Sequence, residues 1–487
     1  MPDQLTAADR HGAVGRLGAS GRRSAEVPIP TIADIAPRLE SRATAFVKEH
    51  RLPGAAVGVV RGEELAWSAG IGFANLERLR APKASTLYRI ASITKTLTGT
   101  AIMQLRDEGR LHLDDAAMTY LPELHAAASP FGPIETVTIR RMLSHESGMM
   151  SEPPGTDWSQ PIYEGDPAAN LARAERLGTQ IPPNAQTKYS NLSYQLLGEI
   201  VSRVSGTPYT EYLQANIITP LGLTSTGFEP LSSGHRQRCA VGYAARGFSD
   251  ELRRATPLAS LHAEGGLWSC VTDLARWIAF QLREDGGPRA GAQVLAGETL
   301  AEMHRARYLG DDEWTAAFGI SWYTERRDSV SWVQHSGSLP GFATNVCFDP
   351  KAKIGAIALL NGVGDASVLA RELATLARDA ESERPAAIAA SAPLPDEWRS
   401  LLGLYADTEY GMIVRLEWRD GELTLVDPDD PTWRPTLTPT GSPDEFAFGR
   451  GFRQAGERCT FERRPDGRVR SLTVVGVETL RRLDPVE

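Results

Sequence analysis

The chain has 487 residues, of which 41% are hydrophobic and 23% charged, a composition typical of a soluble globular protein with room for more than one domain. Its formal net charge of -9 argues against a broad nucleic-acid-binding surface, which needs clustered positive charge. No run of eighteen apolar residues occurs, and residues 1–30 lack the apolar core of a secretory signal, so we expect no membrane association and a cytoplasmic location.

Cysteine and histidine spacing gives no indication of a metal site or a disulfide framework. The four cysteines are far apart and include no C-x-x-C pair, and the nine histidines include no H-E-x-x-H pair. We therefore expect no cofactor and no metal. The cysteines are predicted to be buried thiols: Cys239, Cys270, Cys347 and Cys459.

The first ordered elements are predicted to be a helix and a hairpin. Residues 1–30 are rich in Gly, Ala, Arg and Ser without periodicity, which indicates a disordered or loosely docked tail. Apolar residues at helical spacing predict a helix over 32–50. Short apolar runs at 55–60 and 65–70, separated by Arg61-Gly62, predict a β-hairpin.

The next segment combines a serine and a lysine one helical turn apart. Apolar positions after Ser92 recur at three- and four-residue spacing, which predicts an amphipathic helix that ends near Gly109 and has Ser92 at its N-terminus. A rise of about 1.5 Å per residue places Lys95 roughly 4.5 Å along the axis from Ser92, on nearly the same face. A serine hydroxyl becomes nucleophilic when a neighbouring base takes its proton, and a lysine in a dry pocket is such a base.

A less specific interpretation makes Ser92 a helix cap and Lys95 a solvated surface residue, because serine caps helices routinely. The scarcity of lysine reduces the odds that Ser-x-x-Lys arises by chance. The chain has only six: Lys48, Lys83, Lys95, Lys188, Lys351 and Lys353.

Tyr189 and Asn191 lie just before an apolar stripe that predicts a helix over residues 192–205, closed by Gly206. Side chains at such a loop-to-helix junction can point into a cleft. Tyr189 could then share the proton transfer with Lys95. The alternative is that Asn191 caps the helix and Tyr189 packs in the core.

Strands return late in the chain, after a long and mostly helical region that includes a helix beginning at Thr272-Asp273. Strands are predicted over 330–334, 343–348 and 354–360, followed by a helix over 365–380. Strands at both ends with helices between them predict an α+β domain over residues 31–382. Its antiparallel β-sheet is flanked by helices and carries a helical subdomain.

His335, Gly337 and Ser338 follow the first of these strands. An edge strand beside a nucleophile can present a backbone N–H to the oxyanion, and glycine lets a substrate approach the backbone closely. His335 could bind substrate or modulate the charge of the site. Alternatively, it is a strand-end histidine that faces water.

Residues 383–395 have the composition of a linker, and the texture of the chain changes beyond them. Short alternating runs separated by turns such as Asp420-Gly421 predict a small all-β barrel or sandwich over residues 396–487. No catalytic constellation is visible in this part.

Taken together, three motifs resemble those of the serine β-lactamase and penicillin-binding-protein superfamily. The Tyr-x-Asn form is similar to class C β-lactamases, D-alanyl-D-alanine carboxypeptidases, and the related esterases and D-aminopeptidases. The resemblance covers about residues 31–380, and residues 396–487 resemble the lipocalin-like β-domains of some members. The motifs, in chain order, are Ser92-x-x-Lys95, Tyr189-x-Asn191 and His335-x-Gly337.

The resemblance implies a role for each residue. Ser92 would be the acylated nucleophile, Lys95 its activator and Tyr189 a proton relay, while Asn191 would hold the substrate amide. The oxyanion hole would be the backbone N–H groups of Ser92 and Ser338. Class C β-lactamases have lysine where this chain has His335, so weak or absent β-lactam hydrolysis is expected.

Three functions remain open from the sequence. The first is a serine hydrolase acting on a small ester or on a peptide or amide. The second is an acyltransferase that passes the same acyl group to an alcohol or amine. The third is a catalytically silent binding or assembly module. The expected partner is a small-molecule substrate, and a homo-oligomer is left open.

Overall fold

The computed structural model describes residues 31–156, 166–229, 231–245, 252–255, 262–283, 294–311, 313–327, 330–382, 393–407, 412–419, 421–426, 435–448, 458–474 and 478–483. The predicted tail at 1–30 and most of the predicted linker lie outside these ranges. The chain divides into two compact units, which we call the first unit (Met1–Glu383) and the second unit (Arg384–Glu487).

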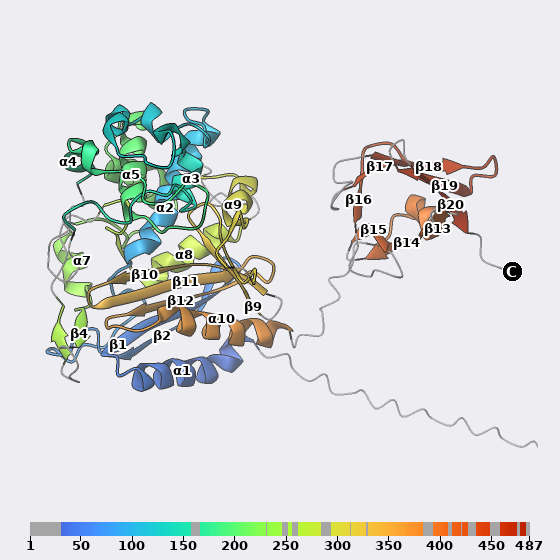
Figure 1. The fold of residues 1–487 in the computed structure, drawn as a ribbon. Coiled ribbons are helices and arrows are strands. Elements are labelled where there is room, and N and C mark those ends of the chain that lie inside the picture. Colours follow the sequence, from blue (N-terminus) through green and yellow to red (C-terminus); the bar gives the residue numbers. More distant parts are fainter. Residues whose placement is uncertain are drawn as a thin grey trace, which may run out of the picture. The chain divides into compact units, whose positions relative to one another are not determined.

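The first unit is built on an eight-stranded antiparallel sheet of order β2-β1-β12-β11-β10-β9-β8-β7 (Figure 1). The chain's early hairpin joins its late strands through β1 and β12, where Val57 pairs with Ala358. The two halves of the chain thus close one sheet, as predicted. Its strands are β1 (Gly54–Arg61), β2 (Glu64–Gly72), β7 (Tyr308–Leu309), β8 (Ala316–Phe318), β9 (Tyr323–Arg327), β10 (Val330–Leu339), β11 (Phe342–Asp349) and β12 (Ile354–Leu360).

Helices α1 (Ile32–Glu49) and α10 (Ala366–Ser382) cover one face of this sheet, and Figure 1 shows them side by side. Apolar residues of both helices form one core cluster with β1, β11 and β12. Thr31 caps α1 through a reciprocal capping box with Asp34. Helix α8 (Val271–Gln281) packs on the opposite face, against β1, β2 and β12. Because both faces are covered, β1 is buried along nearly its whole length.

The helical subdomain lies on the side of α8 and surrounds α2 (Figure 1). We expected α2 to be amphipathic, but every residue from Thr94 to Leu105 is buried. The threonine hydroxyls make this possible because Thr98 and Thr100 donate to main-chain carbonyls of their own helix. The helices here are α2 (Thr94–Asp107), α3 (Ile139–Leu143), α4 (Pro167–Leu171), α5 (Asn191–Ser205), α6 (Tyr209–Leu213), α7 (Ser233–Arg238) and α9 (Gly297–His304).

Short elements complete the first unit. Two-stranded pairs form between β3 (Tyr88–Arg89) and β6 (Trp268–Ser269), and between β4 (Tyr243–Ala245) and β5 (Leu252–Arg254). The single turns are η1 (Ala91–Ile93), η2 (Ala117–Thr119), η3 (Pro122–Ala126), η4 (Ile134–Thr136), η5 (Ala174–Arg176) and the π-turn η6 (Gln214–Ile218).

The second unit is a closed antiparallel barrel, so of the two predicted all-β forms the barrel is the one adopted. Its first and last strands pair, with Leu404 opposite Leu483, and apolar side chains fill the interior. It begins with η7 (Asp396–Leu401). The strands are β13 (Gly403–Asp407), β14 (Met412–Arg419), β15 (Glu422–Val426), β16 (Thr436–Pro439), β17 (Glu445–Phe448), β18 (Arg458–Arg463), β19 (Val469–Val474) and β20 (Glu478–Leu483).

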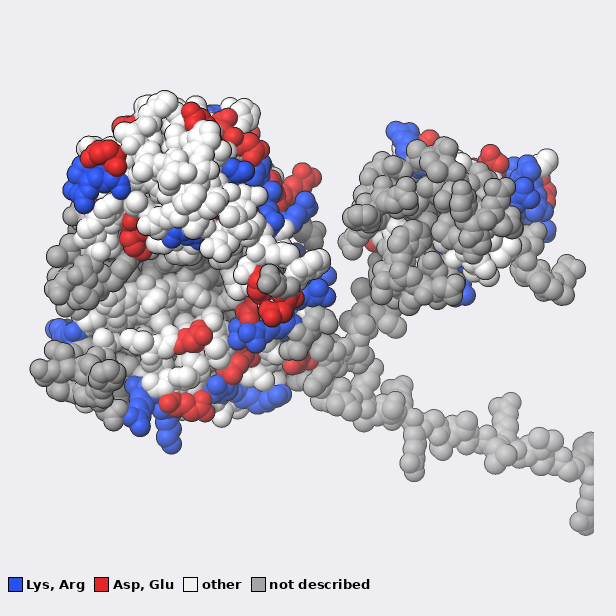
Figure 2. Space-filling model, in the orientation of Figure 1, with Lys and Arg blue, Asp and Glu red and all other residues white. Residues whose placement is uncertain are grey.

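Three general features of the fold are its surface charge, the burial of its cysteines and the polarity of its helices. On the face shown in Figure 2, cationic and anionic residues are interspersed over the first unit. The prediction of buried thiols is confirmed for Cys270, Cys347 and Cys459 and is wrong for Cys239, which is partly exposed. Within the described ranges, no helix has both the length and the apolarity needed to cross a membrane.

Candidate active site

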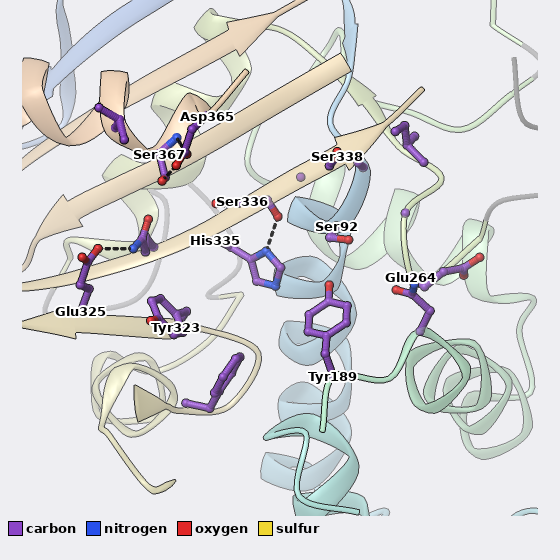
Figure 3. A pocket seen from close by; sticks show the side chains of 18 of the residues that line it. Ser92, Tyr189, Glu264, Tyr323, Glu325, His335, Ser336, Ser338, Asp365 and Ser367 are labelled. Atoms are coloured by element: carbon purple, nitrogen blue, oxygen red, sulfur yellow. Dashed lines mark hydrogen bonds between the residues drawn. The ribbon is translucent and has the colours of Figure 1, made fainter. Parts of the chain in front are cut away.

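A cleft of about 900 Å³ opens in the first unit, beside η1 and the second half of β10. Its walls also include the loop before α5, the β8–β9 region and the start of α10. Figure 3 shows Ser92, Tyr189, His335 and Ser338 around this cleft, with the Tyr189 hydroxyl pointing toward Ser92. Segments far apart in the sequence therefore meet here.

Ser92 lies in η1, which leads directly into α2. Ala91 before it has φ of 49°, an uncommon left-handed conformation that turns the chain sharply at the cleft wall. Ser92 makes no capping bond to the helix, so the cap interpretation is wrong. The sharp turn instead leaves its hydroxyl half-buried at the cleft.

Lys95 is fully buried, with 0% of its surface exposed, so it is not a solvated residue. Its Nζ donates to Ser92 Oγ at 3.1 Å, to Asn191 Oδ1 at 2.7 Å and to the Glu264 main-chain carbonyl at 2.5 Å. These bonds use all three donors of an ammonium group. Lys95 is thereby fixed against the serine that precedes it by one turn.

Tyr189 lines the cleft and is 36% exposed, so the alternative that it packs in the core is wrong. Lys95 Nζ lies 5.0 Å from the centre of its ring. Ser190, not Asn191, caps α5, by accepting from the Ser193 N–H. Asn191 is the first residue of that helix, and its Nδ2 donates to Glu152 Oε1 at 2.6 Å. The cap at Ser190 leaves Asn191 available to Lys95.

Strand β10 runs to Leu339 and does not end near Gln334 as predicted. Its pairing with β9 covers Val330 to Gln334, whereas its pairing with β11 continues to Leu339. Beyond Gln334, the edge of β10 that pairs with β9 in the first half of the strand therefore faces η1. Strand β10 contacts η1, so the two elements pack together. This local edge is where a substrate carbonyl could meet a backbone N–H.

Gly337 allows β10 to approach the turn η1 closely. A Cβ at this position would lie 2.2 Å from the Ile90 carbonyl oxygen and 2.5 Å from Thr344 Oγ1. Thr344 Oγ1 donates to that same carbonyl at 3.0 Å and so ties β11 to the turn. Ser338 lies next on the strand and lines the cleft with Ser92. The oxyanion role of their N–H groups stays a prediction.

Replacing Gly337 by alanine is expected to force β10 away from η1. Overpacking of this kind costs about 1–3 kcal/mol in the free energy of unfolding, and a displacement of about 1 Å at the site can lower turnover about 100-fold. Thermal denaturation and ester hydrolysis measure the two effects. Gly355→Ala, in β12, is the matched control because its Cβ would also be crowded, at 2.7 Å from Ile278. Equal turnover in the two variants would show that close approach at Gly337 is unimportant.

His335 is buried, with 6% of its surface exposed, so the alternative of a histidine facing water is wrong. Its Nδ1 donates to the Ser336 carbonyl at 2.7 Å. Burial and the positive charge of Lys95 lower its pKa to about 4. His335 is therefore a neutral imidazole at pH 7, and it contributes no positive charge to the cleft.

Several residues around the site were not assigned from the sequence. Lys95 bonds to the main-chain carbonyl of Glu264, and a residue type does not indicate that its main chain takes part in a site. Glu325 lines the far part of the cleft and is held by Arg371 at 2.9 Å and by Gln334 at 2.8 Å. His145 stacks on Tyr189. No role was predicted for it from the sequence.

A sheet covered by helices, with Ser, Lys and Tyr side chains converging beside one strand, defines a serine hydrolase fold of the β-lactamase and penicillin-binding-protein type. The family model described as Beta-lactamase matches residues 39–380, and the chain belongs to this family.

Known relatives are similar over most of this region. Protein flp of Staphylococcus aureus (strain COL) is 28% identical over 325 residues, which cover 65% of this chain and 61% of flp. The chain thus spans less than two thirds of that relative's length. The octameric penicillin-binding protein homologue from Pyrococcus abyssi aligns over 91% of this chain and 99% of its own, with a TM-score of 0.60 and 22% identity.

A D-stereospecific amidohydrolase from Streptomyces sp. aligns over 70% of this chain and 98% of its own, with a TM-score of 0.56 and 23% identity. At these identities the two solved structures establish the shared fold.

Proposed function

We propose that this protein is a serine hydrolase that forms an acyl-enzyme at Ser92 and hydrolyses a small ester or a peptide or amide. The observation that supports this most is the 3.1 Å contact between Lys95 Nζ and Ser92 Oγ at the wall of an open cleft. A buried lysine on a serine hydroxyl is the arrangement of an activated nucleophile.

Each residue has a role in the proposed reaction. In the reactive form the coupled Lys95 and Tyr189 pair carries one proton fewer than when both groups are protonated, and the Ser92 proton passes to that vacant site as the hydroxyl attacks the substrate carbonyl carbon. The backbone N–H groups of Ser92 and Ser338 stabilise the oxyanion. The carbon–oxygen or carbon–nitrogen bond then breaks, and the leaving group takes that proton. Water finally hydrolyses the acyl-enzyme, while Asn191 orients the substrate.

The substrate class is best tested with a panel on one preparation: p-nitrophenyl esters of short acids, D-amino-acid p-nitroanilides and the chromogenic cephalosporin nitrocefin. A cleft of about 900 Å³ is in the range of small-molecule sites. D-amino-acid amides belong in the panel because one structural neighbour is described as a D-stereospecific amidohydrolase. Hydrolysis of an ester or an amide is expected, and inertness toward the whole panel would count against the proposal.

We expect β-lactams to be poor substrates, because the neutral His335 attracts their carboxylate only weakly. His335→Lys is expected to raise the acylation rate constant for nitrocefin about tenfold, since a hydrogen bond to a charged group is worth about 1.5–3 kcal/mol. The neutral variant His335→Gln is the control. An equal change in both variants, measured by stopped-flow absorbance, would show that charge at this position does not limit β-lactam acylation.

Acyl transfer is the second candidate, because the cleft is large enough for an acceptor beside the acyl group. An alcohol or amine acceptor would raise the rate of p-nitrophenol release and yield the transferred product. A catalytically silent module, by contrast, would not be acylated at all.

We also propose a homo-oligomer, since the neighbour from Pyrococcus abyssi is described as octameric. Light scattering on the purified protein tests this. A mass equal to one chain would contradict it.

A further inference from the structure

His145, in the loop after α3, is buried and has an uncommon backbone conformation. It is 1% exposed, and its φ of 62° is in the left-handed region. A non-glycine residue in a sparsely populated conformation costs about 1–3 kcal/mol and persists only where its surroundings hold it. Such residues cluster at functional sites.

His145 holds both chain neighbours of Tyr189. The Lys188 N–H donates to the His145 carbonyl at 2.8 Å, and the Ser190 N–H donates to His145 Nδ1 at 3.2 Å. One residue therefore fixes the backbone on each side of the tyrosine. Ser190 in turn caps α5, so the same contact also sets where that helix begins.

The His145 ring also supports the Tyr189 ring directly. Their centroids are 4.2 Å apart with an angle of 31° between the planes. Tyr194 and Phe318 lie against the other parts of the imidazole, at 5.2 and 5.4 Å. Because Tyr189 is partly exposed at the cleft, this stack is an important restraint on the direction of its hydroxyl.

The bond from Ser190 requires an unprotonated Nδ1. Burial lowers the pKa of His145 well below its ordinary value, and the positive charge of Lys95 acts in the same direction. The imidazole is therefore neutral at pH 7, and the contact that orients the Tyr189 segment is maintained.

We propose that His145 is a positioning residue that holds the Tyr189 hydroxyl toward Ser92. It lies behind the tyrosine and is almost completely buried, so it acts through Tyr189 and does not touch the substrate. The proposal rests on the proposed function of the site, and on the proton-relay role of Tyr189 in particular.

The test is a double-mutant cycle between His145→Ala and Tyr189→Phe, read out as the rate constant of Ser92 labelling by a fluorophosphonate. A misplacement of about 1 Å can cost about 100-fold, so His145→Ala is expected to slow labelling 10- to 100-fold. In the Tyr189→Phe background the same substitution is expected to cost less than about threefold, because the group being positioned is gone. Losses that multiply in the double variant would overturn the proposal.

Two further variants separate positioning from general damage to the fold. His145→Asn keeps an acceptor near the position of Nδ1 and tolerates the left-handed backbone, so it is expected to label faster than His145→Ala. If His145→Ala does not fold, His145→Asn replaces it in the double-mutant cycle with Tyr189→Phe. His304→Ala is the matched control, because His304 packs on Trp322 and Phe348 outside the site. It is expected to lower Tm while changing labelling less than about twofold in either background.

The outcomes distinguish this proposal from the proposed function. If the Ser92→Ala variant is still labelled, the proposed function is wrong. If Ser92→Ala blocks labelling and Tyr189→Phe slows it, but the His145 and Tyr189 losses multiply, only the positioning role fails. If Tyr189→Phe is labelled at the native rate, the proposed positioning role of His145 is also wrong, because the Tyr189 hydroxyl would then have no part in the reaction.

Discussion

Replacing Ser92 by alanine is expected to abolish hydrolysis of p-nitrophenyl esters, with a loss of at least about 1000-fold in kcat. The Ser92 hydroxyl is the hydroxyl at the cleft to which the buried Lys95 donates, and no acyl-enzyme can form there without it. The variant should fold normally, because Ser92 makes no capping bond to η1 or α2. Initial rates and a thermal melt measure both effects.

Ser233→Ala is a suitable control for this experiment, since Ser233 is an exposed serine at the start of α7. Its turnover should equal that of the native protein. If Ser92→Ala retained more than a few per cent of native turnover, another residue would have to be the nucleophile.

Replacing Lys95 by alanine is expected to lower the rate of acylation by about 1000-fold or more, as when one member of a coupled nucleophile and base is removed. The substitution deletes the donor to Ser92, Asn191 and the Glu264 carbonyl together. The carbonyl of the buried Glu264 then loses this partner, so Tm should fall as well. Single-turnover labelling measures the chemical step alone.

Two variants make the Lys95 result interpretable. Lys95→Met preserves most of the buried volume and should lose acylation to a similar extent with a smaller change in Tm. Lys83→Ala, at an exposed lysine, should behave as native protein. Near-native acylation in Lys95→Met would move the base role to another group, with Tyr189 the next candidate.

The sequence predicted the main elements of the first unit well, because its helices and strands have strong periodicity and clear ends. The sheet that joins the early hairpin to the late strands was inferred from strands at both ends of the chain, and β1 does pair with β12. The burial of α2 was not predicted, because threonine is a polar residue type and the sequence does not show that these hydroxyls bond to carbonyls of the same helix.

The site was predicted only as far as residue types and order along the chain allow. The resemblance to the superfamily implied that Ser92, Lys95 and Tyr189 belong to one site, and the structure brings the three side chains close together. The extent of β10 was wrong, because the sequence does not show that β9 stops pairing at Gln334 while β11 continues. The contact between Lys95 and Glu264 uses the main-chain carbonyl, which every residue has, so the sequence could not predict it.

Histidine illustrates the same limit. For His335 the sequence left open a residue that binds substrate and a strand-end histidine that faces water. Its burial near Lys95, which makes it neutral, is a property of the fold. The proposed role of His145 depends on its backbone conformation and on bonds to residues more than forty positions away. Periodicity reports which face of an element is buried, but it does not report such contacts.

Peptide mapping by mass spectrometry tests the central claim most directly. The native protein is treated with a fluorophosphonate or a slowly hydrolysed p-nitrophenyl ester, digested, and searched for the added mass. The account predicts one adduct per chain, on the peptide that contains Ser92 and on the oxygen of that residue. An adduct on a different residue, with Ser92 unmodified, would contradict it.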